Sequence, residues 1–549
     1  MNTLLGRAIF LGLIAAFFVV CCGGGGDGGG GVDVGGGGTP PPTGPPNPVA
    51  TYYIDTNNAS ASDSNPGTEA LPWKTITKAN QTLVAGDTVY IKTGTYTTYI
   101  APANSGKADN RITYRNYGTD IVTISGTAYV IRLNGNDYIT VTGINGTNFT
   151  YGIYLYNGAT NNVISYGTFG PANSTAWDVS IIYQSSQYNW IHHITMYQGG
   201  ECSEAGSDRG YVLAVGAEED GADFTQYNLI EDSTFYWGGH HVVALLGRYN
   251  TFRNNYVHNE AWSRSRGNRN MSTVGVATAT GYNLIEGNRF GYAARPCDDY
   301  TVGNVPICSN YNILRYNSLY HHNAYGVAFY DYGTGYSGGS YNKFYNNTIF
   351  NSGYNIYPTY EGGSEDTAIE FSSSTAINNV LKNNLYYSNY QVYTGYTANQ
   401  TFANEFNGDV SGDPKFVNAS TTPPADKTDS TLPNLNLQSS SPAINAGGAL
   451  TTVAVSDTGS GTSLVVSDAR YFQDGTYAPS GTAYADWIAV GTVGNTVQIS
   501  SINYSTNTIT LSNSISRNDG DSVWLYKKSD GVRVLYGSAP DCGSYEYAP

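Results

Sequence analysis

The side chains best suited to proton transfer and to anion binding gather in one central stretch of this chain. All seven histidines lie between residues 192 and 322, and nine of the sixteen arginines lie between residues 209 and 315. Histidine moves protons near neutral pH, and arginine stabilises negative charge. Lysine is absent from residues 108–342, so a base for proton abstraction there must be histidine or arginine. Our candidate catalytic residues are therefore Arg253, His241, Arg248, His258 and Arg269.

Polar inserts in the same stretch supply candidates for sugar binding. They span residues 199–210, 218–223, 259–270 and 295–308. Long inserts on one stretch of a repeat protein usually mark its binding face. From the inserts and their neighbours we take as candidate substrate-binding residues Arg264, Arg266, Trp262 and Trp237.

Four acidic side chains in the second insert can coordinate calcium through their oxygens. They are Glu218, Glu219, Asp220 and Asp223. The alternative is a solvated acidic loop. The histidines match no zinc motif, because adjacent His pairs on β-coils differ from the i, i+4 pair of a helix. Calcium is therefore the one cofactor we consider, and none is required by the sequence.

The charge balance excludes nucleic-acid binding as the default function. Only 12% of the 549 residues are charged, and the net charge is −16. Binding to a phosphate backbone depends on a surplus of lysine and arginine. An acidic surface rich in tyrosine and glycine instead suits an extracellular β-protein that meets neutral or cationic partners, or anionic ones through local basic patches.

A nine-residue pattern must position these residues. Its clearest copies begin with Tyr-Asn, at Tyr188, Tyr227, Tyr249, Tyr282, Tyr311 and Tyr341. Looser copies begin at Asn136, Asn161 and Asn378, and the start-to-start spacings run from 22 to 39 residues. The fourth position is apolar, and a second short alternating strand precedes the copies. A repeat of this period predicts a solenoid of parallel β-coils.

Two further positions of the pattern carry polar columns. The seventh position is asparagine at Asn255, Asn288, Asn317, Asn347 and Asn384. Asparagine tolerates a left-handed turn, and stacked amides can bond from coil to coil. The fifth position alternates in charge through His192, Glu231, Arg253, Glu286 and Arg315. We interpret this column as an exposed ladder of ion pairs worth at most about 1 kcal/mol each; the alternative is a catalytic face.

A row of small residues offers a floor for an extended glycan. If Val243, Val274 and Val327 point inward, their neighbours Ala244, Gly275 and Ala328 point outward. Larger residues bound this row, namely Arg132, Tyr154 and Glu370. We add Ala244, Gly275 and Ala328 to the candidate substrate-binding residues. The alternatives are a covering loop and irregular surface filling.

The segment before the repeats carries a family resemblance. Residues 75–83 predict a short helix with Ile76, Ala79 and Leu83 on one face. Residues 87–91, Asp-Thr-Val-Tyr-Ile, then lead to Gly-Thr-Tyr at 94–96. This order resembles the N-terminal cap of secreted bacterial right-handed parallel β-helix proteins. The resemblance implies an all-β, pectate-lyase-like solenoid over residues 51–448, with a helix covering its open end.

The function that this resemblance implies is polysaccharide binding. Many proteins of the family are polysaccharide lyases, which need a base for the C5 proton of a uronic acid and a positive group for its carboxylate. We expect a lyase of an acidic glycan or, as a second choice, a glycoside hydrolase. The competing hypothesis is a non-catalytic surface adhesin or stalk. In either case we expect a monomer.

The C-terminal part resembles the closing segment of the same family. Residues 413–416 and 441–447 match it, and the chain ends with Asp-Cys-Gly-Ser-Tyr-Glu at 541–546. Between them, residues 449–538 contain six predicted strands, at 463–466, 487–490, 496–502, 508–511, 522–526 and 532–536. We predict an inserted antiparallel β-module at 449–538 and a closing segment at 539–549.

The N-terminus resembles a bacterial lipoprotein signal. An apolar run at residues 8–20 ends at Cys21 and Cys22, either of which can carry the lipid; the alternative is an ordinary secretory signal. Residues 1–22 are the predicted signal and residues 23–50 a Gly- and Pro-rich tether. We expect export and lipid anchoring at the cell surface. An exported protein permits disulfides, and Cys297 with Cys308 is the natural pair.

Overall fold

The structure is a computed structural model, and its compact unit runs from Val49 to Pro549. The predicted signal, most of the tether, and both Cys21 and Cys22 lie outside the described residues. No helix in the part that the structure describes combines the length and the hydropathy of a membrane span. The described residues are 49–173, 179–198, 211–216, 224–238, 241–258, 269–274, 281–292, 305–322, 324–330, 338–353, 366–422 and 432–548.

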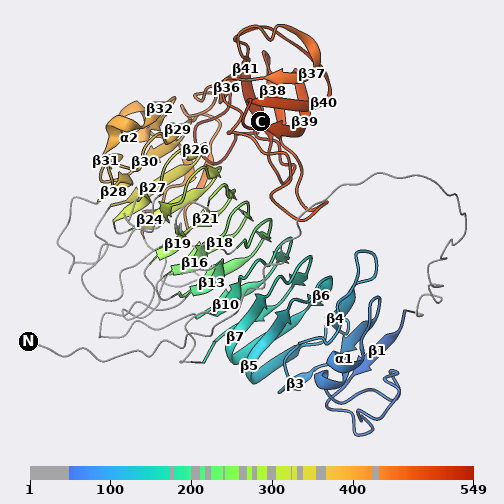
Figure 1. Cartoon of the computed structure of the whole chain (residues 1–549). Coiled ribbons are helices and arrows are strands. Elements are labelled where there is room, and N and C mark those ends of the chain that lie inside the picture. Colours follow the sequence, from blue (N-terminus) through green and yellow to red (C-terminus); the bar gives the residue numbers. More distant parts are fainter. Residues whose placement is uncertain are drawn as a thin grey trace, which may run out of the picture. The chain divides into compact units, whose positions relative to one another are not determined.

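The first face of the solenoid is a 13-stranded sheet in which all neighbours are parallel. Figure 1 shows its strands in chain order from β1 to β32. They are β1 (Thr51–Ile54), β2 (Thr88–Ile91), β4 (Ile112–Asn116), β6 (Ile139–Thr142), β8 (Val163–Ser165), β11 (Trp190–His192), β14 (Leu229–Glu231), β17 (Thr251–Arg253), β20 (Leu284–Glu286), β23 (Ile313–Arg315), β26 (Lys343–Tyr345), β29 (Val380–Lys382) and β32 (Thr401–Ala403).

The second face belongs to a 20-stranded sheet that forks after two long strands, β5 and β7. One branch continues from β9 to β33 and forms this face. Its strands are β3 (Gly94–Tyr96), β5 (Val122–Asn134), β7 (Ile144–Tyr156), β9 (Thr168–Phe169), β12 (Thr195–Tyr197), β15 (Thr234–Tyr236), β18 (Tyr256–His258), β21 (Arg289–Phe290), β24 (Ser318–His322), β27 (Thr348–Ser352), β30 (Leu385–Tyr387) and β33 (Phe406–Asn407).

The third face is the other branch of that sheet, which continues the second halves of β5 and β7. Its strands are β10 (Ser180–Ile182), β13 (Tyr211–Val215), β16 (His241–Leu245), β19 (Arg269–Val274), β22 (Val305–Cys308), β25 (Tyr325–Phe329), β28 (Thr367–Phe371) and β31 (Tyr393–Gly395). Each coil therefore contributes up to three short strands, one to each face, which confirms the predicted parallel β-helix.

The apolar fourth position of the repeat builds the core. Ile230, Phe252 and Ile285 are completely buried there and pair in register on the first face. The predicted start of the first copy is wrong by two residues. Val141, rather than Ile139, pairs with Ile164, so this copy begins at Tyr138 and not at Asn136. Threonine and apolar residues alternate there, and an alternating strand looks the same after a shift of two.

Asparagine ladders run through the interior as predicted. From Asn255 to Asn384, each side-chain amide of the seventh position donates to the next asparagine at 2.9–3.2 Å. The left-handed backbone lies one position earlier than expected, for example at Asn254, with φ 56°, and at Asn383, with φ 58°. A second ladder at the second position was not predicted. It includes the bonds Asn250–Asn283 and Asn283–Asn312.

The predicted N-terminal helix is α1 (Ile76–Thr82). The Thr75 hydroxyl accepts a hydrogen bond from the Lys78 amide at 3.3 Å, which satisfies one free donor of the first turn. Ile76, Ala79 and Leu83 are fully buried in the same core as the coils. The helix therefore closes the end of the hydrophobic core, as the resemblance implied.

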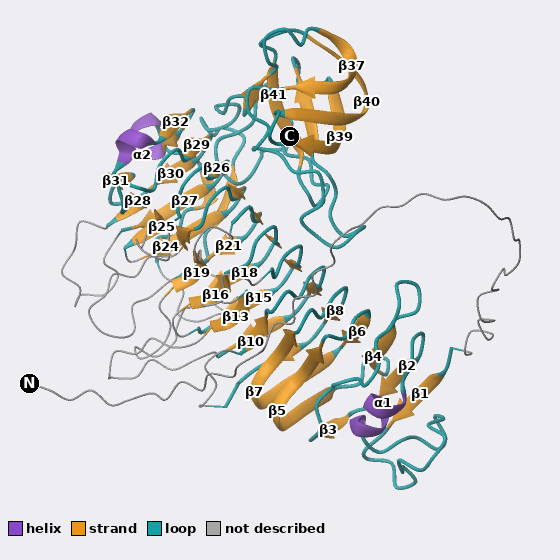
Figure 2. Ribbon diagram, viewed as in Figure 1, coloured by secondary structure: helices purple, strands orange, loops and turns teal. Residues whose placement is uncertain are grey.

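The C-terminal module is a six-stranded antiparallel sheet in the order β36-β41-β38-β39-β40-β37. The predicted strand at 532–536 is absent, and a single bridge joins Lys527 to Arg533. Figure 2 shows the module's strands as a separate sheet from the stacked parallel coils. They are β36 (Thr451–Thr452), β37 (Gly459–Val465), β38 (Trp487–Val490), β39 (Thr496–Asn503), β40 (Thr508–Arg517) and β41 (Ser522–Lys527).

Two C-terminal regions cover two faces of the central coils. Leu284 and Ile313 of the first face share one apolar cluster with Leu464 and Ile488 of the module. On the second face, Phe350 clusters with residues of a small hairpin and of the closing segment. The hairpin strands are β34 (Phe416–Asn418) and β35 (Asn434–Leu437), and two short helical turns, Thr397–Asn399 and α2 (Gly408–Ser411), precede them. The strands of the third face are also buried in the central coils, as in β16, β25 and β28.

Candidate functional site

The charged column of the first face is buried beneath the module. Arg253 Nε lies 2.6 Å from Glu231 Oε2, and the two side chains are only 4% and 7% exposed. The other guanidinium nitrogens donate to the carbonyls of Ser529, at 2.7 Å, and Thr482, at 2.8 Å. The ion-pair ladder was predicted correctly, but its exposure was wrong. Arg253, predicted to be catalytic, is not accessible to a substrate.

Arg315 completes this buried network. Its guanidinium binds Glu286 at 2.5 Å and Asp486 of the module at 2.7 Å, and all three side chains are fully buried. Ser529 of the module donates to the other oxygen of Glu286 at 2.6 Å. The column therefore joins the coils to the module rather than forming a catalytic face.

Two of the histidines, His192 and His322, are neutral parts of the packing. Burial lowers the pKa of His192 to about 4 and the pKa of His322 to about 3. His322 Nδ1 contacts the Ser352 hydroxyl at 2.9 Å, and its Nε2 contacts the Gly291 carbonyl at 3.2 Å. The concentration of histidine in this stretch thus partly reflects the stacking of coils.

Three of the predicted residues lie among aromatic rings or polar neighbours. Arg248 stacks on Phe224 at 4.5 Å, and its Nε donates to the Gln226 side chain at 3.0 Å. On the second face, His258 is 1% exposed and stacks on Tyr236 at 5.0 Å and on Tyr256 at 4.1 Å. The ring of Trp237 meets Tyr236 edge-on at 4.9 Å. These contacts give Arg248 and His258 structural roles that the repeat pattern did not reveal.

The third face brings two predicted catalytic residues to adjacent coils. His241 in β16 is paired in register with Arg269 in β19. On the preceding coil, Tyr211 stacks on His241 with a centroid distance of 5.8 Å. The pairing of His241 with Arg269 cannot be inferred from the sequence, because an insert of variable length lies between their strands.

Ala244 and Ala328 of the predicted small-residue floor lie in one register row of the third face, but they do not form an open floor. Ala244 pairs with Ala214 and Ser272, and Ala328 pairs with Pro306 and Glu370. Ser272 pairs with Ala244 in this row, and Gly275 lies outside the described residues. Ala244 and Ala328 are also 0% exposed, so the predicted open floor is covered at these two residues.

Other predicted residues cannot be placed. Those outside the described residues are Arg264, Arg266, Trp262, Gly275, Glu218, Glu219, Asp220, Asp223 and Cys297. Cys308 is the buried last residue of β22, and its pairing with Cys297 stays a prediction. Within the described ranges no group of three or more His, Cys, Asp or Glu side chains could hold a metal ion. The calcium site likewise stays a prediction.

A tyrosine–arginine patch lies at the start of the same third-face row, and the sequence analysis noted it only as a boundary. Arg132 of β5 is paired in register with Tyr154 of β7. Tyr154 is paired in turn with Ile181, and Ile181 with Ala214. We define the patch as Arg132 with six half-buried tyrosines. These are Tyr99, Tyr129, Tyr151, Tyr154, Tyr156 and Tyr183.

The geometry of the patch suits an acidic sugar. The Arg132 guanidinium lies over the rings of Tyr129 and Tyr156, at 5.4 and 5.3 Å, and hydrogen-bonds to the Tyr156 hydroxyl. Its Nε is buried and has no hydrogen-bond partner within the described part of the chain, so an external carboxylate would reach the terminal nitrogens. The hydroxyls of Tyr154 and Tyr183 bond at 2.7 Å, and burial raises the pKa of Tyr154. The patch therefore combines aromatic surface, neutral hydroxyls and a cation without a carboxylate partner.

These features define the chain as a right-handed parallel β-helix protein with a pectate-lyase-like solenoid. No family model matches the sequence. An uncharacterised protein of Bacillus subtilis (strain 168), YwoF, is 33% identical over 100 residues, which are 17% of this chain and 21% of YwoF. The chain thus matches only about a fifth of that relative's length.

Solved β-helix structures resemble the chain at low identity. The pectate lyase Pel9A is 16% identical, with a TM-score of 0.46 over 75% of this chain and 94% of its own. XylC, solved in complex with xylose, is 12% identical, with a TM-score of 0.42 over 67% and 87%. The PL6 family alginate lyase AlyGC is 16% identical, with a TM-score of 0.43 over 61% and 50%.

Proposed function

We propose that this chain is an exported protein that binds an acidic polysaccharide along the third face of its β-helix. The observation that carries the proposal is the tyrosine–arginine patch at the start of the third-face row. A guanidinium without a carboxylate partner can form two parallel hydrogen bonds to the carboxylate of a uronic acid. The half-buried tyrosine rings supply amphipathic surface against which sugar rings can pack.

The position of the patch favours a long ligand. Neighbouring coils of a parallel sheet are about 4.8 Å apart, so the half-buried tyrosines of successive coils in the patch form a surface along which an extended glycan can lie. The chain has a net charge of −16, so a polyanion can bind only where a local cation offsets this field. Arg132 provides such a cation at the start of the row.

Cleavage by β-elimination is a second candidate function, supported by the register of His241 with Arg269. In this reaction a base takes the C5 proton of the uronate and the C4–O bond breaks. The electron pair forms the C4–C5 double bond, and the departing oxygen takes up a proton. We assign His241 as the base and Arg269 as the group that stabilises the carboxylate. Because the His241 side chain is 1% exposed, this reaction requires that side chain to become accessible to the substrate. Calcium held by the acidic insert at 218–223 would add to that stabilisation.

Binding is tested by titrating the protein with uronate tetrasaccharides and with neutral tetrasaccharides of the same length. We expect Arg132→Gln to weaken uronate binding about tenfold, because a charge-assisted hydrogen bond contributes about 1.5–3 kcal/mol. Arg115→Gln is the matched control, since Arg115 lies over Tyr90 at 5.5 Å on the first face. Equal affinities of the wild type and Arg132→Gln would reject the proposed surface.

Cleavage is tested separately by ultraviolet absorbance of the unsaturated product. Turnover that disappears in His241→Ala, with uronate binding retained, would support the lyase. Binding without product from any uronate polymer would instead identify a non-catalytic adhesin. The export and lipid anchor are tested by labelling cells with a radioactive fatty acid, in the wild type and in variants of Cys21 and Cys22.

A further inference from the structure

The first tyrosine of the repeat forms a stacked column on the coils. Six rings follow one another, with centroid distances of 4.9–5.6 Å. The column begins at Tyr188 and ends at Tyr341, because the equivalent residue of the next copy is Asn378. Tyr341 is 40% exposed. The end of the column thus offers a ring that no further tyrosine of the repeat covers.

A pocket of about 320 Å³ lies between this end of the column and the C-terminal module. The coils contribute Tyr311, Tyr341, Lys343 and Asn378 to its wall. The module contributes Asp468 and Arg470, among others. The site therefore exists only where the module packs against the coils, which gives the module a role beyond covering the first face.

The pocket wall contains two cationic side chains and one carboxylate, so one positive charge is unpaired. Lys343 Nζ lies 2.6 Å from Asp468 Oδ2, so these two charges neutralise each other. The guanidinium of Arg470 stacks over Tyr311 at 4.8 Å and over Tyr504 at 5.8 Å. Within the described part of the chain it has neither an ion-pair nor a hydrogen-bond partner. Its five N–H donors are therefore available to an anion.

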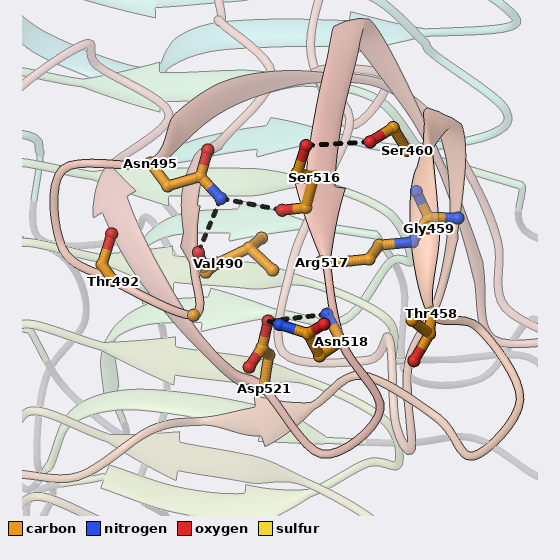
Figure 3. A pocket seen from close by; sticks show the side chains of 11 residues that line it. Thr458, Gly459, Ser460, Val490, Thr492, Asn495, Ser516, Arg517, Asn518 and Asp521 are labelled. Carbon is orange, nitrogen blue, oxygen red and sulfur yellow. Dashed lines mark hydrogen bonds between the residues drawn. The ribbon is translucent and has the colours of Figure 1, made fainter.

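A second pocket, within the module itself, contains an arginine that is fully paired and so can be compared with Arg470. Figure 3 shows this pocket, of about 390 Å³, with Arg517 in its wall. Arg517 binds both oxygens of Asp457 at 2.8 Å and also donates to the Ser463 carbonyl. Its charge is already compensated, so this pocket has no cation to attract an anion. The comparison favours the pocket at Arg470.

We propose that the pocket at Arg470 binds a single uronic acid residue of an acidic glycan. The carboxylate pairs with the guanidinium of Arg470, and the sugar ring packs against the exposed ring of Tyr341. Asn378 is exposed beside them and can bond to sugar hydroxyls. The substrate class rests on the proposed function, but the site lies on a different face from Arg132. Either proposal can therefore be disproved without affecting the other.

The test is titration of the full-length chain with uronate tetrasaccharides, neutral tetrasaccharides and sodium sulfate. In an Arg132→Gln background, we expect Arg470→Gln to reduce the remaining uronate affinity about tenfold and to leave weak binding of neutral sugar unchanged. Tyr341→Ala should reduce it as well. Arg533→Gln is the matched control, because Arg533 stacks on Tyr536 at 4.4 Å in the same module and lies outside the pocket wall.

The outcomes separate the two sites. If Arg470→Gln has no effect in either background, the pocket proposal is wrong whatever happens at Arg132. If Arg132→Gln has no effect but Arg470→Gln does, the proposed function on the third face fails and the pocket stands. If sulfate binds as well as uronate and Tyr341→Ala changes neither, the pocket is a simple anion site and the sugar assignment is overturned.

Discussion

The arginines of the first face and those of the two proposed sugar sites differ in whether they are paired with a carboxylate. Arg253 and Arg315 are buried and bind carboxylates beneath the module. Arg132 and Arg470 stack on tyrosine rings, and no ion pair of the described residues includes them. A paired, buried arginine holds two parts of the fold together. An arginine supported by rings, with unused donors, remains available to an external anion.

Replacing Arg315 should have the largest effect on stability, and it tests the structural role of a paired, buried arginine. We expect Arg315→Ala to lower the free energy of unfolding by about 3–5 kcal/mol, because Glu286 and Asp486 then remain buried without a cation. Urea unfolding followed by tryptophan fluorescence measures the change. The exposed pair Lys92–Glu69 provides the control, and Lys92→Ala should cost less than about 1 kcal/mol. Similar losses in the two variants would mean that the buried network does not hold the module.

Glu405 extends the comparison, because it is a buried acid that forms no ion pair within the described ranges. Burial raises the pKa of Glu405 to about 7, against the hydrogen bonds from Tyr386, Tyr393 and Asn384 that favour its charged form. The unfolded carboxyl titrates near pH 4.3. Between about pH 4 and 7 the folded state therefore holds a proton that the unfolded state has lost, and stability falls as pH rises.

We expect the wild type to lose on the order of 2 kcal/mol between pH 5 and pH 8 relative to Glu405→Gln, which stays neutral throughout. Urea midpoints at the two pH values measure this difference. The variant is its own control for the other buried acids, since those titrate in both proteins. A pH dependence that is identical in the two proteins would show that Glu405 is already charged in the folded state at pH 5.

The core of the fold was predictable because its signals are local. Phe252 at the fourth position, Asn255 at the seventh and Ile76 in the cap helix each follow from a short period in the sequence. Register across an insert was not predictable. The length of the insert before β19 (Arg269–Val274) does not fix where this strand starts.

The partners of the charged residues lie too far away in sequence to be inferred. Arg253 bonds to Ser529, which is 276 residues further along the chain, so no local pattern shows that the column is covered. The tyrosine–arginine patch was missed for the opposite reason. With 49 tyrosines in the chain, the alternation around Tyr154 does not stand out from the rest. Only the pairing of β5 with β7 brings Arg132 among those rings.

The smallest expected effect is on the stability of Arg132→Gln, and it tests the other side of the comparison. Arg132 belongs to no ion pair in the described part of the chain, and its Nε has no hydrogen-bond partner. Removing it leaves no buried carboxylate behind, so we expect a change of less than about 1 kcal/mol in urea unfolding. A loss close to that of Arg315→Ala would mean that Arg132 is structural too. The difference between the two faces would then lie in what covers each arginine, and unused donors would no longer identify a binding site.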